Sequence, residues 1–314
     1  MPIKIPNDLP ASKILKEENI FVMDETRALS QRIRPLKLII VNIMPTKIVT
    51  ETQLLRLLSN TPLQIEVDWL CMESHNSKNT SQEHLMEFYK TFNEIKDNKY
   101  DGLIVTGAPV EKLKFEDVDY WNELTNIFDW ANTNVFSSFF ICWASQASLY
   151  YYYGVEKYQL KEKLTGVYHH HTNPEKMRRR ILRGFDYQFY APHSRYTSVK
   201  KEDIEKIDSL DILASSNDAG VYLVAEKDGS RFFVTGHPEY DPDTLDKEYH
   251  RDLAKCGDCV MPKNYYKNDD VNDEILVKWR SHAYLLFSNW LNYYVYQNTP
   301  YNLDDLLKMK TTNK

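Results

Sequence analysis

The chain has 314 residues, of which 42% are hydrophobic and 27% are charged, and its formal net charge is -6. These values are typical of a globular protein with a sizeable core, and they exclude intrinsic disorder as the default. The acidic balance argues against a nucleic-acid partner, because such proteins usually carry a basic surplus. Residues 1–6 begin no signal peptide, and no window has the roughly 18 apolar residues of a membrane span, so we expect a cytoplasmic protein without a membrane partner.

Strand-like and helix-like segments alternate through the first half of the chain. Short apolar, β-branched runs predict buried strands at 36–43, 65–70, 100–107 and 135–141. Apolar residues at helical spacing predict helices at 11–18, 50–58, 82–95 and 118–132. Because parallel neighbouring strands need a crossover that is usually helical, this alternation predicts an α/β fold with a doubly wound, mostly parallel sheet and flanking helices.

The pattern changes in the second half of the chain. Three strand-like runs with turn signals between them, at 210–216, 220–226 and 231–235, are expected to form a hairpin at an edge of the sheet. A long aromatic-rich helix is predicted at 272–296. We predict three parts of the chain: an N-terminal arm packed on the body at 1–34, a single α/β catalytic domain at 35–300 and a C-terminal tail at 301–314.

Cys142 stands where the predicted strand at 135–141 gives way to a helix with small residues in its first turn. A helix N-terminus presents unpaired N–H groups and a partial positive charge, which favour a thiolate. In an open parallel sheet, ligands bind beyond the carboxyl ends of the strands. We therefore take Cys142 as a candidate nucleophile, with a buried structural cysteine as the alternative.

His237 and Glu239 follow the strand-like run at 231–235 and are separated by Pro238. Because proline fixes φ, the imidazole and the carboxylate can project into the same crevice. Glu239 would then hold the imidazole in one tautomer and stabilise its cation. Together with Cys142 these residues complete the set of nucleophile, base and orienting carboxylate.

A candidate oxyanion site lies at two of the predicted strand ends. The backbone N–H of Trp143 follows the cysteine, and residues 106–111 form a glycine-containing turn after another strand. Acyl transfer passes through a tetrahedral intermediate whose negative oxygen needs fixed donors. Trp143 and this turn are expected to supply them, although an ordinary strand-to-helix turn would have the same sequence.

With these residues in place, the sequence resembles the homoserine O-acyltransferases of the methionine pathway, a branch of the class I glutamine-amidotransferase-like superfamily. The strings that carry the resemblance stand in one order at 41–45, 101–109, 141–146, 163–168, 191–196, 234–240 and 290–296. The resemblance implies that Cys142 takes an acyl group from acyl-coenzyme A as a thioester. It also implies that His237 then activates the homoserine hydroxyl to receive that group, and that the protein forms a homodimer.

The resemblance extends to residues that bind the substrates. It implies that Lys163, Ser194 and Arg251 contact the amino acid, and the residue types fit, since Arg251 can bind an α-carboxylate with two hydrogen bonds. In this family the residue two places after the proline of the Gly-Ala-Pro string correlates with the acyl donor. It is glycine in members that use succinyl-coenzyme A and glutamate in members that use acetyl-coenzyme A. Here it is Glu111, which would fill the space of a succinyl chain and oppose its distal carboxylate. We expect acetyl-coenzyme A as co-substrate and no bound cofactor, with succinyl-coenzyme A as the alternative donor.

Two other classes of function stay open on the sequence. The same three residues would serve a cysteine hydrolase or amidotransferase of the superfamily, and a binding or assembly protein could keep the fold without catalysis. Ile141 before the cysteine and Ala144-Ser145 after Trp143 depart from the Gly-x-Cys-x-Gly elbow of glutamine hydrolysis. This departure argues against an amidotransferase.

No metal site is predicted. Cys256 and Cys259 have CxxC spacing, but a structural zinc site needs two further ligands at matching spacing. The neighbouring histidines at 169–171 would alternate between the two faces of a strand, so they cannot all bind one ion. We expect them to pack or to donate hydrogen bonds near the substrate.

Overall fold

The computed structural model describes residues 3–4, 9–18, 34–75, 79–257 and 259–306. Residues 19–33 of the predicted arm and 307–314 of the predicted tail lie outside them. The strands are β1 (Ile3–Lys4), β2 (Leu36–Val41), β3 (Ile65–Leu70), β4 (Tyr89–Lys90), β5 (Tyr100–Val105), β6 (Val135–Ile141), β7 (Lys157–Thr172), β8 (Gln188–Val199), β9 (Leu210–Ser216), β10 (Gly220–Glu226) and β11 (Arg231–Val234). The α-helices are α1 (Pro10–Glu17), α3 (Lys47–Leu58), α4 (Gln82–Phe88), α5 (Phe92–Ile95), α6 (Trp121–Asn134), α7 (Trp143–Tyr153), α8 (Lys201–Glu205), α9 (Thr244–Cys256) and α10 (Arg280–Trp290).

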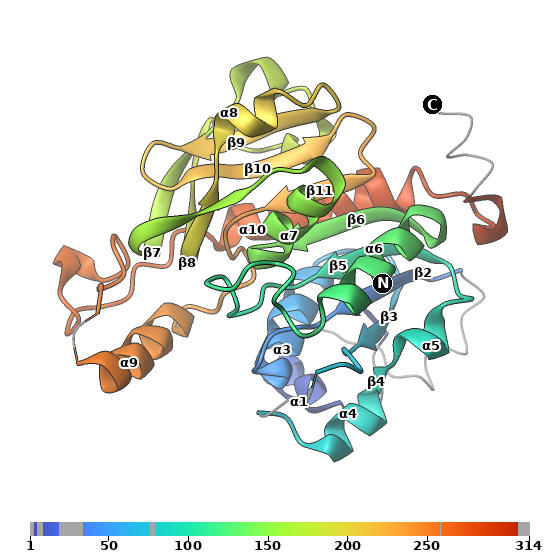
Figure 1. Cartoon of the computed structure of the whole chain (residues 1–314), viewed down its shortest axis with the longest axis horizontal. Helices are drawn as coiled ribbons and strands as arrows, with labels where there is room; N and C mark the ends of the chain where they lie inside the picture. Colours follow the sequence, from blue (N-terminus) through green and yellow to red (C-terminus); the bar gives the residue numbers. More distant parts are fainter. Residues whose placement is uncertain (1–2, 5–8, 19–33, 76–78, 258, 307–314) are drawn as a thin grey trace.

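The described strands form one mixed sheet in the order β1-β3-β2-β5-β6-β11-β10-β9-β7-β8, and β4 pairs with β3 (Figure 1). Pairing is parallel from β1 through β11 and antiparallel from β11 to β8. The predicted α/β fold with a mostly parallel sheet and flanking helices is confirmed.

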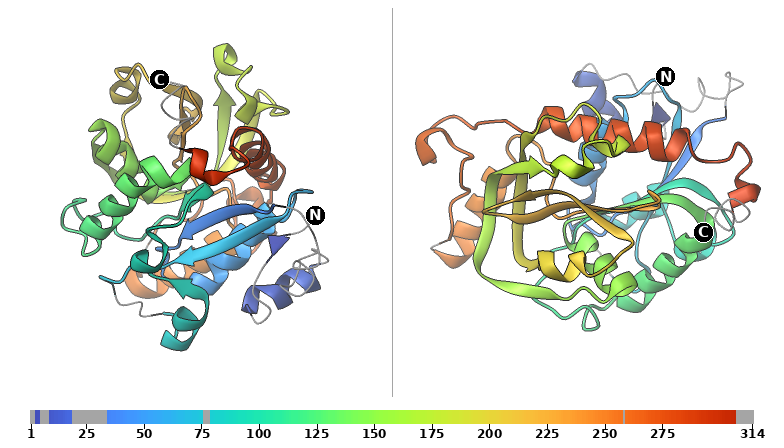
Figure 2. Two further views of the ribbon diagram at one scale, coloured as in Figure 1. Left: turned by 90° about the vertical axis from the view of Figure 1, so that its right-hand side faces the viewer. Right: turned by 90° about the horizontal axis from the view of Figure 1, so that it is seen from above.

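The central strands are buried on both faces. Leu38 and Ile40 of β2 pack toward α3 and α10, whereas Ile39 and Val41 pack toward α6 and α7. This alternation follows from the two-residue period of a strand. Figure 2 shows α10 on one side of the sheet and α6 and α7 on the other. A strand covered on both faces has a continuous apolar run, which is why the sequence identified these strands well.

The runs at 210–216, 220–226 and 231–235 form the predicted antiparallel pairs, as β9–β10 and β10–β11, but their predicted place at an edge of the sheet is wrong. The run at 231–235 becomes β11, which lies between β6 and β10 and pairs in parallel with β6. The edge is formed by the long β7–β8 hairpin instead. The first half of β7 is largely exposed and polar, so it lacks the apolar run by which a strand is recognised.

Two predicted helices are shorter than expected. The helix at 272–296 begins only at Arg280, because residues 270–275 form a turn and a β-bridge with Tyr266, and its last turn, Leu291–Tyr296, is a π-helix. The helix at 82–95 is interrupted by β4. Thr91 then begins α5, with its backbone N–H bonded to the Glu94 carboxylate at 2.7 Å. Within the described residues, no helix has the length and apolarity needed to cross a membrane.

Candidate active site

Cys142 occupies a strained turn between β6 and α7. Its φ is 51° and its ψ is -116°, a conformation that costs a non-glycine residue about 1–3 kcal/mol. Its N–H donates to the carbonyl of Val234 at 2.7 Å, and its own carbonyl accepts from the Ser145 hydroxyl at 2.6 Å. These bonds fix the turn from both sides, as in a nucleophile elbow, and present the thiol beyond the carboxyl end of β6.

Gly107, in the turn after β5, lies beside both Cys142 and His237. A Cβ added to this glycine would be 3.3 Å from Cys142 Cβ and 3.4 Å from His237 Cε1. Two residues that are distant in sequence therefore border the same point. The glycine permits this close approach because it has no side chain.

The imidazole of His237 is held on two sides. Its Nδ1 lies 2.7 Å from Glu239 Oε1, and its ring stacks on the Tyr240 ring with 4.1 Å between the centroids. Burial alone would lower the pKa of His237, but the negative charges of Cys142 and Glu239, together with hydrogen bonds to both, raise it well above its ordinary value. The structure thus brings together the three residues that the sequence predicted as nucleophile, base and orienting carboxylate.

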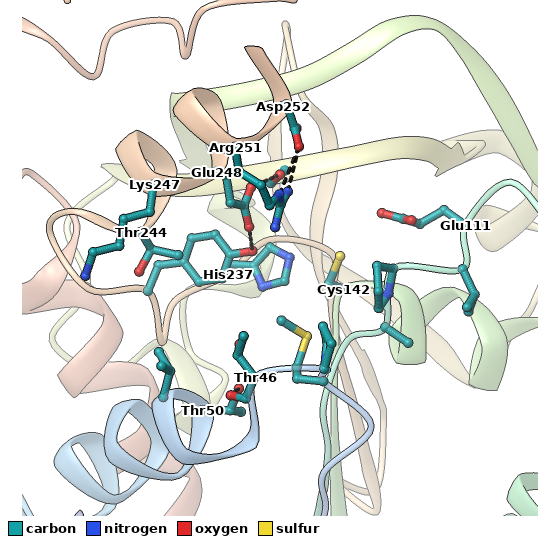
Figure 3. A pocket seen from close by; sticks show the side chains of 18 of the residues that line it. Thr46, Thr50, Glu111, Cys142, His237, Thr244, Lys247, Glu248, Arg251 and Asp252 are labelled. Carbon is teal, nitrogen blue, oxygen red and sulfur yellow. Dashed lines mark hydrogen bonds and ion pairs between the residues drawn. The ribbon is translucent and has the colours of Figure 1, made fainter. Parts of the chain in front are cut away.

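Lys163, Ser194 and Arg251 line the same pocket as Cys142 and His237, which has a volume of about 520 Å³. Figure 3 shows Arg251 on the same side of this pocket as Glu248 and Asp252. Lys163 Nζ lies 2.8 Å from Asp252 Oδ2, and Arg251 Nη2 lies 2.9 Å from Asp252 Oδ1. The Ser194 hydroxyl donates to Glu248 Oε2 at 2.5 Å. Burial opposes the charge of Lys163, yet Glu248 and Asp252 raise its pKa. This end of the pocket therefore offers both signs of charge side by side.

Glu111 lines the pocket on the other side of Cys142 (Figure 3). Burial raises the pKa of its carboxyl, although His237 and Lys163 act in the opposite direction. Trp143 is the first residue of α7, so its N–H has no acceptor within the helix and is available to an oxyanion. Glu111 therefore lies in the pocket and the Trp143 N–H directly follows Cys142, and their roles stay predictions.

Three further residues of the pocket were missed by the sequence analysis. Glu248 and Asp252 lie one turn apart on α9, and the Tyr240 hydroxyl donates to Glu248 Oε1 at 2.7 Å. The four-residue spacing of these two acids on either side of Arg251 was the available signal. It was not used because no helix was predicted at 244–256.

The described residues contain no group of three or more metal-ligating side chains. The CxxC prediction cannot be followed further, because the Cys256 side chain and residue 258, which lies between the two cysteines, are outside the described residues. His170 is fully buried and His171 is exposed, as expected for neighbours in a strand.

The family model described as homoserine O-succinyltransferase matches residues 2–301. A homoserine O-acetyltransferase of Catenibacterium mitsuokai is 73% identical and covers 99% of this chain and 100% of its own. The protein of the same name from Petrotoga mobilis is 60% identical and covers 98% of each chain.

Solved structures confirm the expected class I glutamine-amidotransferase-like fold. A glutamine amidotransferase from Thermotoga maritima has a TM-score of 0.53 at 12% identity, and the match covers 82% of this chain and 98% of that one. At this identity the similarity concerns the fold alone. The family model, by contrast, matches residues 2–301, and the two relatives cover 99% and 98% of this chain. The chain therefore belongs to the homoserine O-succinyltransferase family.

Proposed function

We propose that this protein transfers an acetyl group from acetyl-coenzyme A to the hydroxyl of homoserine through a thioester on Cys142. The observation that carries the proposal is the convergence of Cys142 and His237 on Gly107, with Glu239 bonded to the far side of the imidazole. The relatives named homoserine O-acetyltransferase support the acceptor and the donor.

In the first half-reaction, the Cys142 sulfur attacks the thioester carbonyl of the donor. His237, whose raised pKa keeps a proton available, gives that proton to the departing sulfur of coenzyme A. The negative oxygen of the intermediate accepts a hydrogen bond from the N–H of Trp143. The products are an acetyl thioester on Cys142 and free coenzyme A.

In the second half-reaction, the hydroxyl of homoserine attacks this thioester. Because Nδ1 of His237 is bonded to Glu239, Nε2 is the nitrogen left to receive the hydroxyl proton. Cys142 leaves as a thiolate, and O-acetylhomoserine departs. The base is then again an imidazolium beside a thiolate, as at the start of the cycle.

The acceptor end of the pocket fits the two charges of an amino acid. We expect the α-carboxylate to bind Arg251 and Ser194, and the α-ammonium group to bind Glu248. In the free protein Arg251 and Lys163 pair with Asp252 instead. Homoserine would exchange these internal pairs for pairs of its own, so charge balance is kept when it binds.

Glu111 favours the acetyl donor, because its carboxylate occupies the region that a succinyl chain would enter. The family model carries the name of the succinyl enzyme, whereas the whole-length relatives above carry the name of the acetyl enzyme. Succinyl-coenzyme A is the second candidate donor. A homodimer and a cytoplasmic location stay predictions from the sequence.

Intact-mass measurement tests the proposal. Incubation with acetyl-coenzyme A is expected to add one acetyl group, which homoserine discharges as O-acetylhomoserine and water does not. The Cys142→Ala variant should take up no acetyl group, although it keeps Cys71, Cys256 and Cys259. Discharge by water would indicate a hydrolase, and a protein without any adduct would indicate a binding function.

A further inference from the structure

Tyr240 closes a turn that begins at the candidate base, His237. Its backbone N–H donates to the His237 carbonyl at 3.3 Å, and Pro238 stands at the second position of the turn, where proline is favoured. The turn folds the Tyr240 side chain back over the imidazole. The two rings stack with 4.1 Å between their centroids and 18° between their planes. Tyr240 therefore covers one face of the imidazole.

The Tyr240 ring is itself fixed to the body of the protein. The residue is buried, and its backbone carbonyl accepts a hydrogen bond from Trp279 Nε1 at 3.1 Å. It packs in a small apolar cluster with Trp279, Tyr265 and Leu245. Because the χ2 angle of histidine has only a broad intrinsic preference, an imidazole needs outside contacts to keep one plane. The stack on Tyr240 supplies such a contact, in addition to the bond between Nδ1 and Glu239.

The hydroxyl of Tyr240 contacts the acceptor end of the pocket. It donates to Glu248 Oε1 at 2.7 Å, and the Ser194 hydroxyl donates to Glu248 Oε2 at 2.5 Å. An ionised carboxylate can only accept, so Tyr240 keeps its phenolic proton in this contact. Burial, together with the charge of Glu248, raises the pKa of Tyr240 well above its ordinary value. Two hydroxyls, one for each oxygen, thus set the plane of the Glu248 carboxylate.

We propose that Tyr240 is a positioning residue that fixes the separation of His237 and Glu248, and thereby selects an acceptor with the amino-to-hydroxyl spacing of homoserine. The inference rests on the proposed transfer of an acyl group to homoserine. His237 acts on the hydroxyl of the acceptor and Glu248 binds its ammonium group. The aromatic ring between them is rigid, so the distance from its stacked face to its hydroxyl is constant. Serine is one methylene shorter, so its hydroxyl falls short of the base when its ammonium group is bound.

Discharge of the acetylated protein tests this role in Tyr240→Phe. The variant keeps the ring and its stack but removes one of the two hydroxyls that orient Glu248. The protein is first acetylated with acetyl-coenzyme A and freed of coenzyme A, and its loss of the acetyl group to homoserine or to serine is then followed by intact mass. The ratio of the two rates, homoserine over serine, is expected to fall about tenfold, as for the loss of one hydrogen bond to a charged group. Acetylation needs no acceptor and should proceed at the wild-type rate.

Two comparison variants separate the ring from the hydroxyl and both from the fold. Tyr240→Leu removes the stack, so acetylation should slow as well, by up to about 100-fold, because a misplaced base costs that much. Tyr266→Phe removes another buried hydroxyl, which donates to Asp246 of the same helix α9 at 2.6 Å but does not line the pocket. Neither half-reaction should change in Tyr266→Phe.

A double-mutant cycle shows whether the hydroxyl acts through Glu248. Glu248→Ala removes the carboxylate that the Tyr240 hydroxyl orients. Tyr240→Phe combined with Glu248→Ala should therefore discharge to homoserine no more slowly than Glu248→Ala alone. Losses that multiply would mean that the two side chains act independently, and they would overturn the inference. The cycle and Tyr240→Phe decide the question if Tyr240→Leu does not fold.

An unchanged ratio in Tyr240→Phe would overturn the inference and leave Tyr240 a structural residue. An equal fall of the ratio in Tyr266→Phe, or acetylation at the wild-type rate in folded Tyr240→Leu, would also overturn it. The wild type tests the proposed function separately. A wild type that forms no acetyl adduct, or one that homoserine does not discharge, contradicts that function and this inference with it. A wild type that discharges to homoserine beside an unchanged ratio in Tyr240→Phe contradicts this inference alone.

Discussion

Lys157, the first residue of β7, donates from its ammonium group to the backbone carbonyl of Glu111 at 2.8 Å. It also donates to the carbonyl of Leu113 at 2.5 Å, and its ammonium lies 4.2 Å from the centroid of the Phe115 ring. Burial lowers the pKa of Lys157, although Glu111 opposes this shift. The loop that carries the donor-facing glutamate is thus fixed by a side chain that does not line the main pocket.

Replacing Lys157 by Met is expected to weaken the choice of acyl donor. The methionine keeps the apolar stem but removes both bonds, so Glu111 can move away from a longer acyl chain. The ratio of kcat/KM for acetyl- over succinyl-coenzyme A should fall about tenfold, the equivalent of about one hydrogen bond from a charged donor. Lys114→Met, an exposed change in the same loop, should leave the ratio unchanged. Equal losses with both donors would refute the idea.

Glu111→Gly tests the donor assignment directly. Removal of the side chain opens space beside Cys142 and removes a carboxylate that opposes the distal charge of succinate. kcat/KM for succinyl-coenzyme A should rise by at least about tenfold and that for acetyl-coenzyme A should fall. An unchanged acetyl preference would show that the donor is selected elsewhere in the pocket.

The sequence revealed those parts of the fold and site that depend on local pattern. Strands buried on both faces, such as β2, have continuous apolar runs, and Cys142 and Glu239 each follow such a strand. The β7–β8 hairpin was missed, because its exposed half is polar and its partner lies outside any short window.

Glu239→Gln is expected to reduce kcat/KM about 10²- to 10⁴-fold, within the range of general acid–base catalysis. The amide can still accept from His237 Nδ1, but it carries no charge to stabilise the imidazolium. Because Glu239 helps to raise the pKa of His237, the variant should lose its imidazolium proton at lower pH. Glu87→Gln, on the exposed side of α4, serves as the control. Activity within about twofold of the wild type would remove Glu239 from the mechanism.

Glu248→Gln should separate the two half-reactions. The amide keeps one oxygen, which can accept from either Ser194 or Tyr240, whose hydroxyls now donate to different oxygens of Glu248. It cannot neutralise the ammonium group of homoserine. KM for homoserine is expected to rise about tenfold, because a charge-assisted bond becomes a neutral one. Acetylation of Cys142 should proceed at the wild-type rate, measured by mass after mixing with acetyl-coenzyme A alone. Slower acetylation would assign Glu248 to the donor side instead.

Lys47 is buried at the start of α3, and its ammonium group donates to the Asn42 carbonyl at 2.5 Å. Burial lowers the pKa of Lys47 to about 8 from 10.5, although Cys71 and Glu51 oppose the shift. Between these two values the unfolded chain binds more protons, so the free energy of unfolding rises with pH across this window. Below pH 8 the folded protein bears the whole cost of the buried charge, about 3 kcal/mol.

Lys47→Met removes this cost along with the ammonium group. Relative to the wild type, its free energy of unfolding should therefore be higher, and this gain in stability should be about 3 kcal/mol larger at pH 7 than at pH 10.5. Urea denaturation at both pH values gives the difference, and other titrating groups cancel because each variant is compared with the wild type at the same pH. Lys37→Met, which removes an exposed lysine from β2, should change by less than about 0.5 kcal/mol at either pH. If the free energy of unfolding of Lys47→Met differs from that of the wild type by the same amount at pH 7 and pH 10.5, folding does not lower the pKa of Lys47. Its site must then contain solvent or a stronger anionic partner.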